Sequence, residues 1–81
     1  MTTHYQYIDF VQFGDTGKTT IWRCLTRHGD ILGRVKWFPG WRQYSFFPSE
    51  DISTVFSAGC LADIQAFIGE LMAERGRERR Q

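Results

Sequence analysis

The spacing of apolar residues changes once along this chain, close to residue 57, and this change restricts the fold more than any other feature. Before it, apolar and β-branched residues come in short runs separated by turn residues, which is typical of strands. After it, the apolar residues follow the i, i+3, i+4, i+7 spacing of an amphipathic helix. They are Leu61, Ile64, Phe67, Ile68, Leu71 and Met72. Because strands are followed by one helix, the chain is predicted to form an α+β fold.

Four runs are predicted to be strands, because aromatic and β-branched residues are frequent in them. They are Tyr5–Phe13, Thr19–Arg27, Ile31–Phe38 and Arg42–Phe47. A short edge strand at Thr54–Phe56 would be a fifth. The prediction is an antiparallel sheet of four to five strands, with one C-terminal helix packed on one face.

The helix is predicted to span Gly59–Arg75, with Ser57 as its N-cap and Gly76 as its C-terminal stop. A chain of 81 residues is long enough for one domain. We therefore expect a single α+β domain over residues 1–76, followed by a basic and disordered tail over residues 77–81.

Tight turns between the strands predict which side chains share a face, because successive residues of a strand point to opposite sides. One face is predicted to pack under the helix, with Gly33 leaving room for the ring of Phe46. This face carries Trp22, Cys24, Ile31, Gly33, Val35, Trp37, Tyr44 and Phe46. The other face carries Ile21, Arg23, Leu25, Leu32, Arg34, Lys36, Phe38, Gln43, Ser45 and Phe47. It is predicted to be half apolar and half cationic, which favours a binding surface.

The net charge of +1 hides an uneven distribution of charged residues. Outside residues 75–81, every lysine and arginine lies between Lys18 and Arg42, where Asp30 is the only acid. Cations interleaved with rings on a sheet can neutralise phosphates and stack bases. The predicted binding residues are Arg23, Arg34, Lys36, Phe38, Trp41, Arg42, Gln43 and Phe47. In this hypothesis Phe38 and Trp41 stack or anchor, and the basic residues contact anions.

The resulting prediction is a small binding module, not an enzyme, that binds nucleic acid or a nucleic-acid-containing complex. One alternative is a protein-interaction module or host-directed inhibitor that uses the same face, including a homodimer. Another is an ordinary sheet face whose charges keep the chain soluble. Raising the salt concentration distinguishes nucleic-acid binding from protein binding, because affinity for phosphates falls steeply as salt rises.

Other kinds of site have little support in the sequence. The residues His4, His28, Cys24 and Cys60 lack metal-ligand spacing, and no pair of acids suits hydrolysis, so we predict no metal, cofactor or catalytic residue. The stretch GDTGKTT lacks the spacing of a phosphate-binding loop. Both cysteines are predicted to be buried thiols, with a disulfide or a reactive Cys60 as alternatives. Without a signal or membrane-spanning segment, the expected location is the cytoplasm.

Three motifs between Gly33 and Ile64 are similar to one known family. They are G-R-V-K-W from Gly33, W-R-Q-Y-S-F-F-P from Trp41 and C-L-A-D-I from Cys60. This pattern resembles a family of short bacterial and phage-associated proteins that have no assigned activity, and the matching positions run from about Trp22 to Ile68. The resemblance implies a stand-alone α+β domain and an origin in a mobile element. It implies no catalytic residue.

Overall fold

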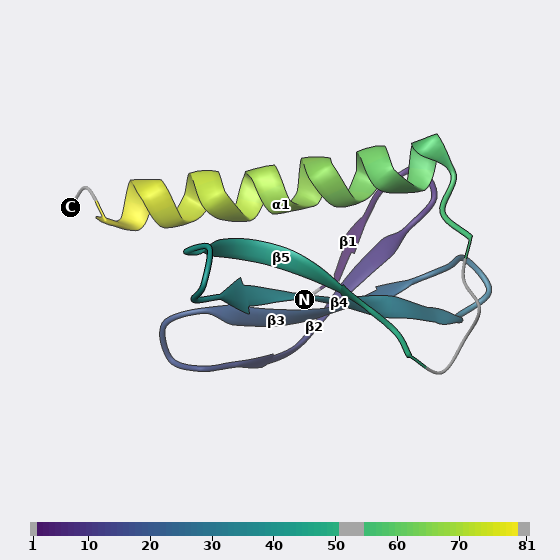
Figure 1. The fold of residues 1–81 in the computed structure, drawn as a ribbon. Coiled ribbons are helices and arrows are strands. Elements are labelled where there is room, and N and C mark those ends of the chain that lie inside the picture. Colours follow the sequence, from purple (N-terminus) through teal and green to yellow (C-terminus); the bar gives the residue numbers. More distant parts are fainter. Residues whose placement is uncertain (1, 51–54, 80–81) are drawn as a thin grey trace.

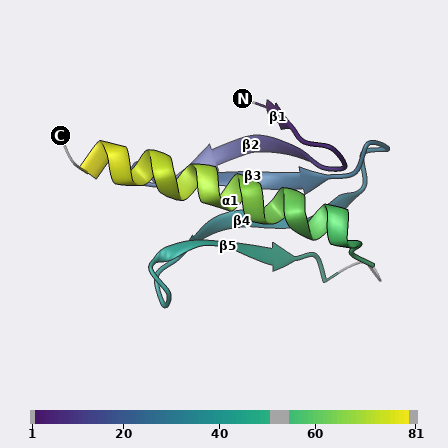
Figure 2. The same ribbon diagram turned by 90° about the horizontal axis from the view of Figure 1, so that it is seen from above.

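The computed structural model describes residues 2–50 and 55–79. Five strands precede one helix: β1 (Thr2–His4), β2 (Asp9–Asp15), β3 (Thr20–Leu25), β4 (Ile31–Phe38), β5 (Gln43–Pro48) and α1 (Ala58–Arg79). The strands form one antiparallel sheet in the order β1-β2-β3-β4-β5, so each strand pairs with the next along the chain (Figure 1). The helix α1 runs over one face of this sheet, above β3 and β4 (Figure 2). The predicted α+β fold is confirmed.

The core lies between α1 and the sheet, and Phe67 is at its centre. The Phe67 ring stacks on Phe10 of β2, with ring centroids 4.1 Å apart and an interplanar angle of 11°. Its other neighbours are Trp22 of β3, at 4.9 Å, and Tyr5, at 6.0 Å, both edge to face. Because aromatic rings bury large areas, Phe67 alone packs α1 against several parts of the sheet.

The prediction for Ile31 and Leu32 is wrong, because β4 contains a bulge. Cys24 lies opposite Gly33 while Leu25 lies opposite Ile31, so Leu32 is an extra residue in the pairing. As a result Leu32 is only 6 % exposed and joins the core, whereas Ile31 is 45 % exposed. Beyond the bulge the predicted alternation holds, with Arg34 exposed and Val35 buried.

Gly33 also has the role that the sequence predicts. A Cβ atom at Gly33 would lie 2.8 Å from Cζ of Phe46 and 2.4 Å from the backbone oxygen of Phe47. The missing side chain therefore makes room for the Phe46 ring and for the neighbouring strand.

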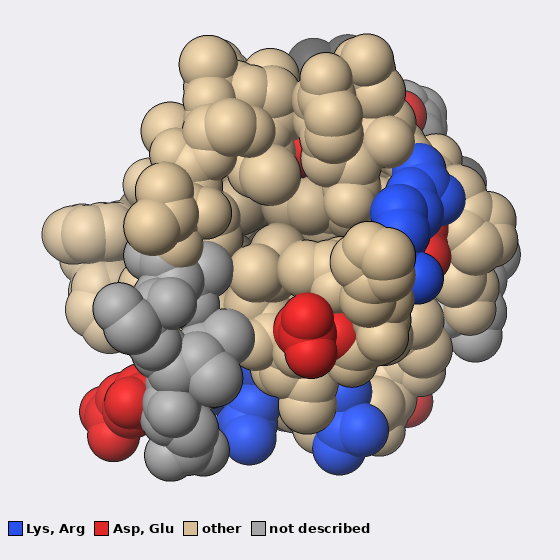
Figure 3. All heavy atoms as spheres, turned by 90° about the vertical axis from the view of Figure 1, so that its right-hand side faces the viewer, with Lys and Arg blue, Asp and Glu red and all other residues tan. Residues whose placement is uncertain are grey.

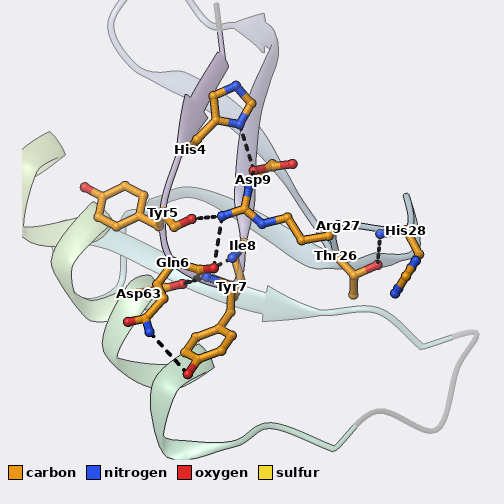
Figure 4. Close-up of polar contacts among 10 residues, drawn as sticks. All are labelled: His4, Tyr5, Gln6, Tyr7, Ile8, Asp9, Thr26, Arg27, His28 and Asp63. Carbon is orange, nitrogen blue, oxygen red and sulfur yellow. Dashed lines mark hydrogen bonds and ion pairs between the residues drawn. The ribbon is translucent and has the colours of Figure 1, made fainter.

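The first predicted strand, Tyr5–Phe13, is wrong in its boundaries, because residues 5–8 form the connection between β1 and β2. The buried carboxylate of Asp63 on α1 accepts hydrogen bonds from the backbone N–H groups of Tyr7 (2.7 Å) and Ile8 (3.1 Å). From the other side, Arg27 donates to the carbonyl oxygens of Tyr5 and Gln6 (Figure 4). These contacts come from residues distant in sequence, so local propensity could not predict them.

Arg27 also forms an ion pair with Asp9 at the start of β2, with 2.9 Å between Nη1 and Oδ1. His4 Nδ1 lies 2.8 Å from the same carboxylate oxygen (Figure 4). Arg27 therefore stabilises the β1–β2 connection, which separates its role from that of the basic residues on the sheet face.

The helix begins at Ala58, one residue before the predicted Gly59, and its predicted end is wrong. The Ser57 hydroxyl oxygen accepts a hydrogen bond from the N–H of Cys60 (3.2 Å), which confirms the N-cap. However, α1 runs through Gly76 to Arg79. A glycine inside a helix costs only about 1 kcal/mol relative to alanine, and the glutamates and arginines on both sides of Gly76 are good helix formers, so this glycine does not end the helix. Residues 77–79 of the predicted disordered tail are therefore helical, while residues 80 and 81 lie outside the described residues.

One further prediction near the C-terminus is wrong. The described part of the predicted edge strand, Val55 and Phe56, is not a strand, and Thr54 lies outside the described residues. Arg75, at the predicted end of the helix, is half-buried. Its guanidinium lies 4.1 Å from the centroid of the Trp37 ring, and it donates a hydrogen bond to the carbonyl oxygen of Lys18 (3.2 Å).

Candidate functional site

The strand pairing places four residues in one row across the sheet. Val11 of β2 lies opposite Arg23 of β3, Arg23 lies opposite Arg34 of β4, and Arg34 lies opposite Phe47 of β5. Their sequence neighbours on β3 and β4, such as Trp22 and Val35, are buried toward α1. Because side chains alternate along a strand, this row lies on the face away from the helix. We call it the outer face.

The outer face continues along β4 toward the β4–β5 turn. Lys36 and Phe38 follow Arg34 at alternate positions and lie opposite Ser45 and Gln43. The outer face is therefore defined by Val11, Phe13, Ile21, Arg23, Arg34, Lys36, Phe38, Gln43, Ser45 and Phe47.

Two arginines face each other in the middle of this surface. Arg23 and Arg34 are direct cross-strand neighbours on β3 and β4, and both are exposed. Like charges directly opposite each other destabilise a sheet. In the part of the chain that the structure describes, neither arginine nor Lys36 forms an ion pair with a carboxylate. The pair is therefore an electrostatic cost that an anion placed between the guanidinium groups would relieve.

Rings hold these cations in place. The Arg23 guanidinium lies 4.5 Å from the centroid of the Phe13 ring, and that of Arg34 lies 5.7 Å from the same centroid. Nζ of Lys36 lies 4.6 Å from the centroid of the Phe47 ring. Cation–π contacts at this range are attractive and limit the motion of long side chains. These contacts thus restrain the positions of the positive groups on the outer face.

Phe13 belongs to this surface, although the sequence did not identify it. The register of β2 and β3 shifts between Gln12 and Gly14, so Phe13 is the extra residue of a bulge and is 41 % exposed. Alternation alone cannot predict a bulge. The available signal was the isolated glycine that follows Phe13 inside a strand pattern.

The β4–β5 turn adds a second group of rings. Trp41 is 68 % exposed, and its ring meets Phe38 edge to face with centroids 5.0 Å apart. Phe38 in turn meets Phe47 at 6.1 Å. A Cβ atom at Gly40 would lie 2.8 Å from the Phe38 ring, so the glycine permits this packing. Arg42 has a φ of 53°, in the left-handed region, at the end of the turn.

The structure thus gathers most of the predicted site. Arg23, Arg34, Lys36, Phe38 and Phe47 share the outer face, and Trp41 adjoins it through Phe38. Gln43, the first residue of β5, is exposed on the same face opposite Phe38, and Arg42 is exposed at the end of the turn. The Ser45 hydroxyl donates a hydrogen bond to the carbonyl oxygen of Gln43 (3.4 Å), and Arg42 forms no ion pair among the described residues.

The outer face borders a hollow that extends toward the β3–β4 turn. Its lining includes Ile31, Gly33, Arg34 and Lys36, together with the acids Asp30 and Glu50. Figure 3 views the end of the molecule where α1 begins, and both acidic and basic side chains are visible there. The hollow is therefore mixed in charge, and the basic groups relevant to an anion are those on the outer face.

The two cysteines are free thiols in different environments. Cys24 is buried as predicted, and desolvation raises the pKa of its thiol to about 12, which keeps it protonated and a poor nucleophile. Cys60 is half-buried, so the prediction that both thiols are buried is wrong for this residue. It lies near the start of α1 and packs against the edge of the core.

Comparisons with protein-family models, with curated proteins and with solved structures found no match to this chain. The resemblance to phage-associated proteins therefore stays a prediction. Among the described residues, no group of histidine, cysteine and acidic side chains could hold a metal ion. The described helix is also not apolar enough to cross a bilayer.

Proposed function

We propose that this protein is a small non-catalytic module that binds nucleic acid, alone or within a nucleic-acid-containing complex, through the outer face. The observation that carries the proposal is the pair of opposed arginines, Arg23 and Arg34. Two unpaired like charges in the middle of a sheet do not stabilise it. A bound polyanion would neutralise their repulsion, and this would favour binding. A cytoplasmic location and an origin in a mobile element are parts of this proposal that rest on the sequence alone.

Phosphodiester groups suit the arrangement of the cations. Arg23 and Arg34 are cross-strand neighbours, and Lys36 follows Arg34 at the next outward position of β4. Alternate residues of a strand are about 6.7 Å apart, so the three positive groups can contact successive phosphates of one backbone. Guanidinium groups also match the geometry of phosphate oxygens. Contacts of this kind release counterions and make the affinity depend on salt.

Replacing Arg34 with threonine tests the proposal, because it removes one of the two opposed arginines. Threonine suits a strand, so the fold should be kept, and removal of one of two opposed charges should leave the free energy of unfolding unchanged or raise it by up to about 1 kcal/mol. We expect the affinity for an oligonucleotide, measured by fluorescence anisotropy at low salt, to fall about tenfold. The slope of log K against log salt should become shallower by about 0.7 to 1.

Lys18→Ala is the matched control for Arg34→Thr. It removes one positive charge from the exposed loop between β2 and β3, away from the outer face. Equal losses in the two variants would show that binding follows net charge and not this face, and absence of binding to any oligonucleotide would refute the proposal.

Exposed apolar groups support a second candidate, a protein partner or a second copy of this chain. Phe13, Ile31 and Trp41 are all large and exposed. An association held by such groups persists at high salt, whereas phosphate binding weakens. Sedimentation of the protein at low and high salt, with and without oligonucleotide, therefore distinguishes the two candidates.

A further inference from the structure

The rings of the outer face differ in how much of their surface a ligand can reach. Phe13 has the Arg23 guanidinium over its ring, and Phe47 has Nζ of Lys36 over its ring. Phe38 is half-buried and lies between Trp41 and Phe47. Among the described rings of this region, Trp41 is the one with most of its surface in solvent, at 68 %. A planar ligand group can therefore stack on Trp41, while the other rings already support cations.

Trp41 also lies at one end of the row of positive groups. Along β4, the outward positions are Arg34, Lys36 and Phe38, and Trp41 contacts Phe38. The hydrogen bond from the Trp41 N–H to the carbonyl oxygen of Phe38 (3.2 Å) closes the turn and fixes this position. A backbone that follows β4 over Arg34 and Lys36 would bring a base to the indole ring.

Resting on the function proposed above, we infer that the ligand is a single strand, with phosphates on Arg23, Arg34 and Lys36 and one unpaired base stacked on Trp41. A duplex keeps its bases stacked on each other, so it can offer phosphates to the arginines but no free base face inside its length. Stacking on an aromatic side chain is tolerant of sequence because every base has a π-face. Single-stranded DNA and RNA share this chemistry.

The test compares three ligands of about 12 nucleotides at one salt concentration: a single strand, its duplex, and an abasic strand that keeps every phosphate. DNA and RNA versions of the single strand separate the two sources of this ligand. By fluorescence anisotropy, the wild type should bind the single strand at least about fivefold more tightly than the duplex or the abasic strand.

Trp41→Ala should weaken binding of the single strand by about 5- to 150-fold, because one stacked base is lost. Its affinity for the abasic strand should stay unchanged, which also shows that the variant is folded. Trp41→Phe keeps an aromatic ring and should retain most of the affinity.

The outcomes separate this inference from the proposed function. If the three ligands bind equally well and with the same dependence on salt, the protein still binds nucleic acid as proposed above, and the single-strand inference is wrong. The inference is also wrong if Trp41→Ala binds the single strand as the wild type does. If none of the ligands binds, both the inference and the proposed function are wrong.

Discussion

Phe67→Ala is expected to lower the free energy of unfolding by about 3–5 kcal/mol, a large part of the roughly 5–15 kcal/mol that stabilises a domain. The Phe67 ring stacks on Phe10 and meets Trp22 and Tyr5 edge to face, so its removal leaves a cavity lined by three rings. The sheet cannot close around this space without moving the strands that carry those rings. Urea-induced unfolding followed by circular dichroism measures the loss.

Leu61→Ala is the matched control for Phe67→Ala, because it also removes a large apolar side chain from α1. Leu61 is 54 % exposed, so its loss should cost less than about 1 kcal/mol. A loss for Phe67→Ala no larger than that for Leu61→Ala would mean that the helix does not seal the sheet through Phe67.

The second large effect is a loss of stability in alkaline solution. Burial raises the pKa of the Cys24 thiol from 9.0 to about 12. Above pH 9 the unfolded chain releases this proton while the folded chain retains it, so stability is fully present below pH 9 and falls until about pH 12. At 1.36 kcal/mol per pKa unit, the loss approaches about 4 kcal/mol. Burial, and then the Glu70 carboxylate, also raise the pKa of Tyr5 to about 12, which adds to the loss above pH 10.

Cys24→Ala isolates the contribution of the thiol. This variant lacks the titrating group, so the decrease in its urea midpoint between pH 8 and pH 11 should be clearly smaller than that of the wild type. Parallel decreases in the two proteins would show that other groups cause the alkaline loss and that Cys24 is not held protonated by the core.

Periodicity predicted the parts of this fold that depend on local spacing. The helix and its Ser57 cap follow from side-chain spacing and capping chemistry. Simple alternation along the strands predicts that Arg23 and Arg34 lie on the face opposite to Trp22 and Val35. The structure confirms this arrangement. These features depend on a few neighbouring residues, which is why sequence alone was sufficient.

The errors have a common physical cause, which is that tertiary contacts override local patterns. The bulge in β4 brings Leu32 into the core and turns Ile31 outward, against the alternation. The bulge at Phe13 adds a ring to the outer face in the same way. The turn at residues 5–8 depends on Asp63 and Arg27, which are distant in sequence. No local window contains these contacts.

The most direct test of the outer face is nuclear magnetic resonance with isotope-labelled protein, titrated with a single strand of about 12 nucleotides. We expect the largest chemical-shift changes at Phe13, Arg23, Arg34, Lys36 and Trp41. Amides on the exposed side of α1, such as those of Gln65 and Gly69, should stay unchanged. The largest changes on α1, or no change at any residue, would contradict this expectation.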